Sequence, residues 1–177
     1  INAMYNYAVM LSSGEGTEMN KEEACRYFKM AADKGQINAM YDYALRLKNG
    51  EGVTANKEEA SRYFKLSADK GNSKAMYDYG IMLQNGDGIQ MNRKQSYQYF
   101  KLAAENGDTR AMNSYGLMLQ KGNGVQMNKA DARRYFKKAA DNGDVDAMYN
   151  YAKMLQPDNF GAINEEARHY YKMAADA

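Results

Sequence analysis

The chain has a single histidine, His169, and a single cysteine, Cys25. These residue types most often act as general base, thiol nucleophile or transition-metal ligand. Nucleophilic catalysis needs a base within hydrogen-bond reach of a hydroxyl or thiol, and a zinc site needs three or four ligands. One residue of each type leaves no His/Cys cluster for a metal and only isolated residues for a catalytic pair. The sequence therefore predicts a protein that is not an enzyme, with no catalytic residue, no metal site and no cofactor.

Two further patterns could suggest chemistry but have a structural explanation. Gly14-Glu15-Gly16 resembles part of a phosphate loop, yet such a loop follows a strand and opens a helix. Here the glycines follow a helical pattern and recur later in the chain, so they predict turns. The pairs Glu22-Glu23 and Glu58-Glu59 lie in the predicted first turn of a helix, where carboxylates complement the helix dipole.

The elements that position these residues are repeats. The sequence Ala-Met-(Tyr/Asn) returns every 36 residues, and Tyr-Phe-Lys keeps the same step from Tyr27 to Lys137. A fixed period of this size predicts one small unit stacked several times, each burying its apolar face on the next. We expect one repeat domain over 1–177, with units at 1–36, 37–72, 73–108, 109–144 and 145–177.

The second unit shows the expected structure of each copy. Ala39, Tyr43, Ala44 and Leu47 recur at helical spacing and predict a first helix that ends at Gly50. Small residues stand at the counterparts of Ala44, so the two helices of a pair can approach closely; they are Ala8, Gly80, Gly116 and Ala152.

A second helix follows in each unit. Asn56 is an N-cap residue with Glu59 three positions on, and Phe64 is the large apolar residue of the helix that ends near Gly71. Since no strand pattern occurs anywhere, the sequence predicts an all-α fold of five helix-turn-helix units.

The fifth unit departs from this pattern. It reads Gln156-Pro157-Asp158-Asn159-Phe160-Gly161 where the others carry Gly-x-Gly, and Pro157 should end its first helix early. Tyr171 replaces the phenylalanine of the other units, which suits a less fully covered site.

Charge and composition exclude several classes of partner. Lys and Arg total 24 against 22 Asp and Glu, and a net charge of +2 argues against nucleic acid or an anionic membrane as partner. No stretch approaches the roughly 20 apolar residues of a membrane helix, and no signal peptide opens the sequence. The lone cysteine fits a reducing compartment such as the cytoplasm, but the localisation stays open.

Both ends of the sequence fall at repeat boundaries. Ile1-Asn2-Ala3-Met4 matches 37–40, and no polar capping element is visible at either end. We therefore expect a piece of a longer array, whose terminal faces could associate end to end.

The repeat resembles the Sel-1-like repeat, a relative of the tetratricopeptide repeat. The resemblance is carried in the second unit, and by counterparts in the others, at Ala39, Tyr43, Ala44, Leu47, Gly50, Gly52, Val53, Ala60, Tyr63, Phe64, Ala68 and Gly71. It implies a right-handed α/α superhelical solenoid that serves as an adaptor for protein or peptide partners. Some bacterial members clamp each helix pair with a disulfide. Here the positions equivalent to Cys25 hold Ser61, Tyr97, Arg133 and Arg168, so Cys25 is expected to be an inert, outward-facing thiol.

If the tetratricopeptide likeness holds, the first helix of each unit lines a concave surface. Positions −1, +2, +6 and +9 from the repeated alanine share one face of that helix. We predict a partner-binding surface formed by Asn38, Tyr41, Leu45, Lys48, Lys74, Tyr77, Ile81, Gln84, Arg110, Asn113, Leu117, Gln120 and Tyr149. Tyrosine supplies contact area, amides pair with peptide backbone, and Lys or Arg meets a carboxylate.

Several alternatives stay open. The tyrosine row could instead cover the seam between repeats, or it could bind single-stranded nucleic acid or a glycan by stacking. The array could also serve only as a spacer or a self-associating unit. Four methionines share a position that holds Arg46 in the second unit, which predicts partial exposure; they are Met10, Met82, Met118 and Met154.

Overall fold

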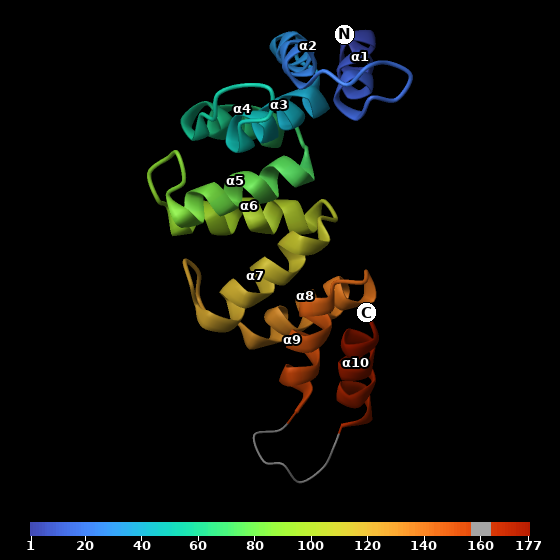
Figure 1. Ribbon diagram of the computed structural model, residues 1–177. Helices are drawn as coiled ribbons and strands as arrows, with labels where there is room; N and C mark the ends of the chain where they lie inside the picture. The colour runs from blue at the N-terminus through green and yellow to red at the C-terminus, as the bar shows by residue number, and fades with distance from the viewer. Residues whose placement is uncertain (157–163) are drawn as a thin grey trace. The chain divides into compact units, whose positions relative to one another are not determined.

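The computed structural model describes residues 1–156 and 164–177, and within these ranges the chain forms ten α-helices and no β-strand. The all-helical prediction is confirmed. The helices are α1 (Asn2–Ser13), α2 (Lys21–Asp33), α3 (Ile37–Asn49), α4 (Lys57–Asp69), α5 (Ser73–Asn85), α6 (Arg93–Glu105), α7 (Thr109–Lys121), α8 (Lys129–Asp141), α9 (Val145–Leu155) and α10 (Glu165–Asp176) (Figure 1).

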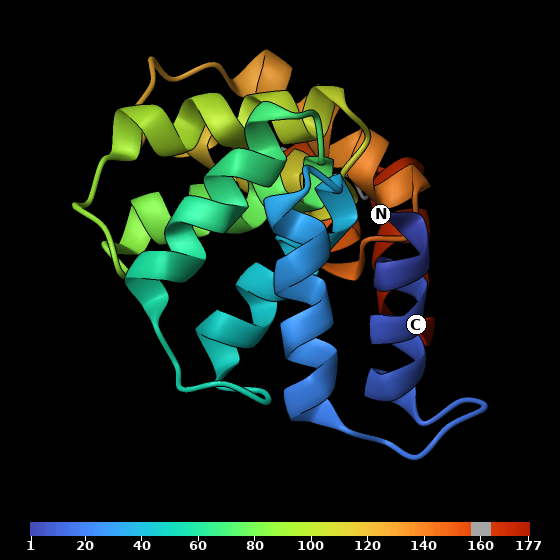
Figure 2. The same cartoon turned by 90° about the horizontal axis from the view of Figure 1, so that it is seen from above.

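The helices belong to two compact units, residues 1–96 and 97–177, with the boundary inside α6. In the first unit α1, α2, α3 and α4 each pack on the next helix along the chain, and in the second unit α7, α8 and α9 do the same. Figure 2 shows α1 and α2 side by side, joined at one end by the loop of residues 14–20. Each repeat thus supplies two helices, and neighbours in sequence are neighbours in space, as in a helical repeat solenoid.

Local chemistry sets the helix ends as the sequence predicted. Gly50 closes α3 in the left-handed conformation with φ 74°, which a glycine adopts without steric cost. At the start of α4 the side chain of Asn56 accepts a hydrogen bond of 3.0 Å from the backbone N–H of Glu59. Equivalent asparagines cap α2, α8 and α10.

The second glycine of the turn is required for a reason that the sequence did not show. Gly52 has φ 70°, and a Cβ atom there would lie 2.1 Å from the carbonyl oxygen of Lys21. The turn of the second repeat therefore lies directly against the first residue of α2 in the preceding repeat. Gly88 meets Lys57 in the same way, with its Cβ position 2.4 Å from the carbonyl carbon.

The core of each repeat is one phenylalanine surrounded by small residues. Phe28, Phe64, Phe100 and Phe136 are no more than 1% exposed. A Cβ atom on Gly116 would lie 2.7 Å from Cε1 of Phe136, so the close helix approach predicted from the small residues is present in that repeat. In the fifth repeat Tyr171 is only half-buried, as expected for its hydroxyl.

A hydrogen bond links the second helices of consecutive repeats. The hydroxyl of Tyr63 on α4 donates to Oδ1 of Asp33 on α2 at 2.7 Å, and Lys29 forms an ion pair of 2.8 Å with the same carboxylate. The bonds from Lys29 and Tyr63 lower the pKa of Asp33. In the second unit Tyr170 donates to Asp141 in the equivalent way.

Three sequence predictions concern exposure, and the structure corrects two of them. His169 is exposed, as predicted. Cys25 does not face outward; it is 4% exposed, and burial raises the pKa of its thiol. Inertness thus follows from burial.

The exposure predicted for the four methionines holds only in part. Met10 is 40% exposed and Met154 half-buried, whereas Met82 and Met118 are 0% and 4% exposed. The inference from Arg46 was wrong because its guanidinium lies 4.0 Å from the centroid of the Phe28 ring and donates to the backbone oxygen of Asp42. An arginine satisfied in this way does not need an exposed site.

The first helix of the fifth repeat, α9, is shorter than its counterparts α3, α5 and α7. It ends at Leu155 after 11 residues, whereas α3, α5 and α7 each have 13. Pro157 and the rest of the predicted irregular turn lie outside the described residues.

Candidate functional site

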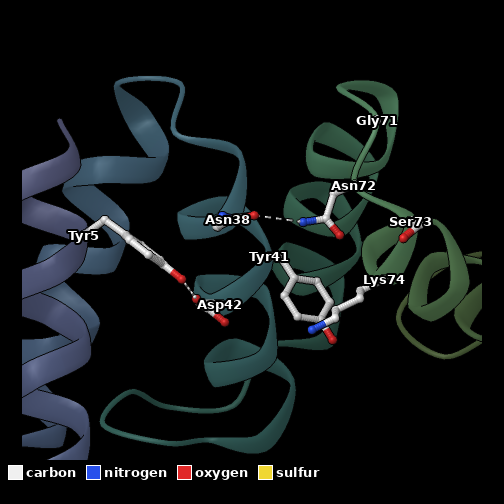
Figure 3. Close-up of a pocket in the computed structure, with 8 residues that line it drawn as sticks. All are labelled: Tyr5, Asn38, Tyr41, Asp42, Gly71, Asn72, Ser73 and Lys74. Carbon is white, nitrogen blue, oxygen red and sulfur yellow. Dashed lines mark hydrogen bonds between the residues drawn. The ribbon is translucent and has the colours of Figure 1, made fainter. Parts of the chain in front are cut away.

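The first unit contains a cavity of about 430 Å³ on the first helices of three consecutive repeats (Figure 3). Its lining is polar and consists of Tyr5, Asn38, Tyr41, Asp42, Gly71, Asn72, Ser73 and Lys74. A second cavity of about 390 Å³ adjoins it, because both are lined by Asn38, Gly71 and Asn72. The second cavity adds Gln36, Ile37 and Lys70 to the lining.

A tyrosine–aspartate pair stands at each seam of this surface. The hydroxyl of Tyr5 donates to Oδ2 of Asp42, and that of Tyr41 donates to Oδ2 of Asp78, both at 3.0 Å. Each tyrosine thus bonds to the first helix of the next repeat, 37 residues on. In the second unit Asn150 donates to Oδ1 of Asn113 at 3.0 Å in the same register.

Burial keeps the Tyr5–Asp42 pair in its hydrogen-bonded form. It raises the pKa of Tyr5 to about 12, with the Asp42 carboxylate as the next cause, so the phenol stays protonated at neutral pH. Burial also raises the pKa of Asp42, although the Tyr5 bond and the charges of Arg46 and Lys74 act in the opposite direction. The pair therefore holds its proton on the tyrosine and presents it to the carboxylate.

Two asparagines form the other wall of the cavity. Asn72 caps α5, because its Oδ1 accepts from the backbone N–H of Ala75 at 3.0 Å. Its Nδ2 donates to Oδ1 of Asn38 at 3.3 Å, as the dashed line in Figure 3 marks. The helix cap thus orients Asn72, and Asn72 in turn orients Asn38.

Three of the predicted binding residues line the cavity, and the other ten lie outside its lining. Asn38, Tyr41 and Lys74 line the cavity. Elsewhere on the first helices, the half-buried members of the predicted set are Leu45, Lys48, Tyr77, Ile81, Gln84, Leu117 and Gln120.

The remaining three predicted residues lie in the second unit. Tyr149 is 51% exposed, and Arg110 is exposed and pairs with Asp108 at 2.9 Å. Asn113 is only 9% exposed because it is occupied by Asn150, so it offers little surface to a ligand.

Sequence reasoning did not include five of the cavity residues, namely Tyr5, Asp42, Gly71, Asn72 and Ser73. A signal was available for Asp42, because a polar residue follows the tyrosine row in every copy, as Asn6, Asp42, Asp78, Ser114 and Asn150. A polar residue repeated on a half-buried face predicts a partner for it. Asn72 is the N-cap of α5 and Ser73 is its first residue, and the closeness of this helix start to Asn38 is a property of the packing between repeats.

The second unit has its own cavity of about 620 Å³, lined mainly by α6, α7 and the segment before α8. Tyr97 and Tyr115 meet there with their hydroxyl oxygens 2.9 Å apart. One of the two hydroxyls donates its proton to the other in a hydrogen bond, and burial raises the pKa of Tyr115.

Metal chemistry finds no support in the described ranges, where no group of three or more His, Cys, Asp or Glu side chains could hold an ion. None of the helices described is long and apolar enough to cross a membrane.

The family follows from the repeat itself. The Sel1 repeat model matches the chain five times in tandem, at residues 1–36, 37–72, 73–108, 109–144 and 145–177. The chain belongs to the Sel1 repeat family. Sel1 repeats typically act as scaffolds for protein–protein interaction.

Solved Sel1 structures have the same fold. A Sel1 repeat protein from Oxalobacter formigenes is similar over 99% of this chain and 72% of its own, with 29% identity and a TM-score of 0.90. A protective antigen of uropathogenic Escherichia coli strains, c5321, is similar over 99% of this chain with 26% identity and a TM-score of 0.91. This chain spans 38% of the length of that antigen.

A more distant structure shows the fold alone. The cysteine rich protein B of Helicobacter pylori is 21% identical over 73% of this chain and 92% of its own, with a TM-score of 0.59. No curated protein is similar enough to count as a relative of this chain.

Proposed function

We propose that this Sel1 repeat chain is a non-catalytic adaptor that binds an extended segment of a partner protein along the first helices of its repeats. The observation that carries the proposal is the cavity of about 430 Å³, because three consecutive repeats contribute to its lining. Tyr5 belongs to the first repeat, Asn38 and Tyr41 to the second, and Ser73 and Lys74 to the third. A ligand in the cavity would therefore contact several repeats at once, as an extended peptide does.

The surface around the cavity has the composition of a peptide site. Tyr41 and Leu45 are half-buried and offer contact area on a rigid helix, while Asn38 offers an amide. Rigid tyrosines and well-oriented amides recognise a peptide at a low cost in side-chain entropy. The hydrogen bonds of Tyr5 and Tyr41 hold this surface in one conformation before a ligand arrives.

A selection from a displayed library of random linear peptides tests the proposal. The affinity of peptides selected on the wild-type protein is measured for two variants. Asn38→Tyr fills the cavity from an exposed position, and Gln98→Tyr is a matched change at an exposed residue of α6. Circular dichroism checks that both variants stay helical. We expect enriched peptides that bind the wild type and Gln98→Tyr but lose affinity for Asn38→Tyr. A library without enrichment overturns the proposal. Peptides that bind Asn38→Tyr as tightly as the wild type overturn the assignment of the cavity as the binding site.

A further inference from the structure

The hydrogen-bonding groups of the cavity indicate which kind of segment would bind. We infer that the cavity takes an acidic peptide, whose carboxylate is bound by Asn38, Ser73 and Lys74. This inference rests on the proposed function, and it adds the chemistry of the ligand.

The first observation is a surplus of donors. Nδ2 of Asn38, the hydroxyl of Ser73 and the ammonium of Lys74 have no hydrogen-bond or ion-pair partner within the part of the chain that the structure describes. All three residues line the same cavity, and Figure 3 labels each of them among the lining residues. Two of the three groups can only donate, and a serine hydroxyl can donate as well.

The second observation is that three side-chain acceptors of the cavity already have a donor. Oδ1 of Asn38 accepts from Asn72, and Oδ1 of Asn72 accepts from Ala75. Oδ2 of Asp42 accepts from Tyr5. A ligand that satisfies the three free donors must bring acceptors, and a carboxylate brings two oxygens and no proton at neutral pH.

The charges around the cavity favour the same sign of ligand. The only carboxylate in its lining belongs to Asp42, and the positive charges of Arg46 and Lys74 already act on it. Lys70 adds a further exposed cation to the adjoining cavity. In the lining itself Lys74 is the one cation and Asp42, engaged by Tyr5, is the one carboxylate, so a ligand carboxylate would pair directly with Lys74.

Two kinds of peptide carboxylate share this chemistry, namely an acidic side chain and a free C-terminus. Fluorescence anisotropy separates them with four labelled peptides. The first alternates Glu with Gly and has an amidated C-terminus; the second replaces Glu by Gln and is also amidated. The third is the Gln peptide with a free C-terminus, and the fourth alternates Lys with Gly. A labelled oligothymidylate tests single-stranded nucleic acid as an alternative partner.

We expect the Glu peptide to bind more tightly than the amidated Gln and Lys peptides, with an affinity that falls as salt is added. Lys74→Gln should weaken this binding about tenfold, because it removes the charge-assisted bond, and Lys74→Arg should restore part of it. Lys94→Gln, a matched change at an exposed lysine of α6, should leave the affinity unchanged. Preferential binding of the free-terminus Gln peptide would assign the carboxylate to a C-terminus.

The outcomes separate this inference from the proposed function. If the selected peptides lose affinity for Asn38→Tyr but are neutral or basic, the adaptor function stands and the acidic preference is overturned. Equal affinity for the Glu, Gln and Lys peptides, or equal losses for Lys74→Gln and Lys94→Gln, likewise overturns it. Tighter binding of oligothymidylate than of any peptide overturns both.

Discussion

The hydroxyl of Tyr5 donates to Oδ2 of Asp42 at 3.0 Å, across the seam between the first two repeats. Tyr41 and Asp78 repeat this relationship one unit later at the same distance. The bond joins the helices that carry the proposed binding surface, so it couples stability to the shape of the cavity. It also explains why an aspartate follows the tyrosine row in the second and third repeats.

Removing this bond should destabilise the first unit. We expect Tyr5→Phe and Tyr41→Phe each to lower the free energy of unfolding by about 1–2 kcal/mol, since the half-buried Asp42 or the buried Asp78 loses its donor. Tyr149→Phe is the control, because Tyr149 is 51% exposed and its ring contact with Tyr171 survives the change. Urea unfolding followed by circular dichroism measures the three differences. Equal values for all three variants would mean that the seam bonds contribute nothing to stability.

The same bond predicts a loss of stability in alkali. The pKa of Tyr5 is raised from 10.0 to about 12 in the folded chain, mainly by burial. Since the unfolded state loses the phenolic proton first, the contribution of Tyr5 is complete below pH 10 and is lost as the pH rises towards 12. The difference in unfolding free energy between wild type and Tyr5→Phe should therefore shrink between pH 10 and about pH 12, measured by urea titration. A constant difference across this range would contradict the raised pKa.

The sequence predicted those parts of the fold that depend on local chemistry. The cap of α4 by Asn56 and the end of α3 at Gly50 follow from a few neighbouring residues. The same pattern of residues occurs in several repeats. The pairing of small residues with Phe64 and its counterparts was also readable, because it concerns the two helices of one repeat. Internal repetition thus acts as its own confirmation.

Contacts between repeats were less readable. The predicted exposure of Cys25 and Met82 was wrong, because the burial of both side chains depends on packing that a helical pattern does not contain. The cavity combines Tyr5, Asn38 and Lys74, which lie in three different repeats, so only their packing shows that they meet. The position of Asp42 was marked by a repeated polar residue, but its partner 37 residues away was not.

The small residue inside a helix pair gives a prediction about the core. A Cβ atom on Gly116 would lie 2.7 Å from Cε1 of Phe136, so Gly116→Ala forces the ring to move. We expect a net loss of about 1–2 kcal/mol, because overpacking outweighs the gain in helix propensity. The double variant with Phe136→Leu should lose less than the sum of the two single changes, since leucine vacates part of the space. Strictly additive losses in thermal or urea unfolding would show that the two residues do not meet.

The two glycines of the second turn allow a sharper comparison. Gly50 and Gly52 have nearly equal φ angles of 74° and 70°, so alanine at either position carries the same cost of a left-handed conformation, about 1 kcal/mol. Their surroundings differ. A Cβ on Gly50 would lie at an ordinary 3.4 Å from Cβ of Ala55, whereas one on Gly52 would lie 2.1 Å from the carbonyl oxygen of Lys21 in the preceding repeat.

Because backbone cannot give way as a flexible side chain does, Gly52→Ala must separate the first two repeats or displace the turn. We expect it to lower the free energy of unfolding by at least about 1–3 kcal/mol more than Gly50→Ala does. Hydrogen exchange followed by mass spectrometry should also show faster exchange at the start of α2 in Gly52→Ala only. Equal losses for the two variants would place the turn of the second repeat away from α2, and the close seam on which the cavity depends would be wrong.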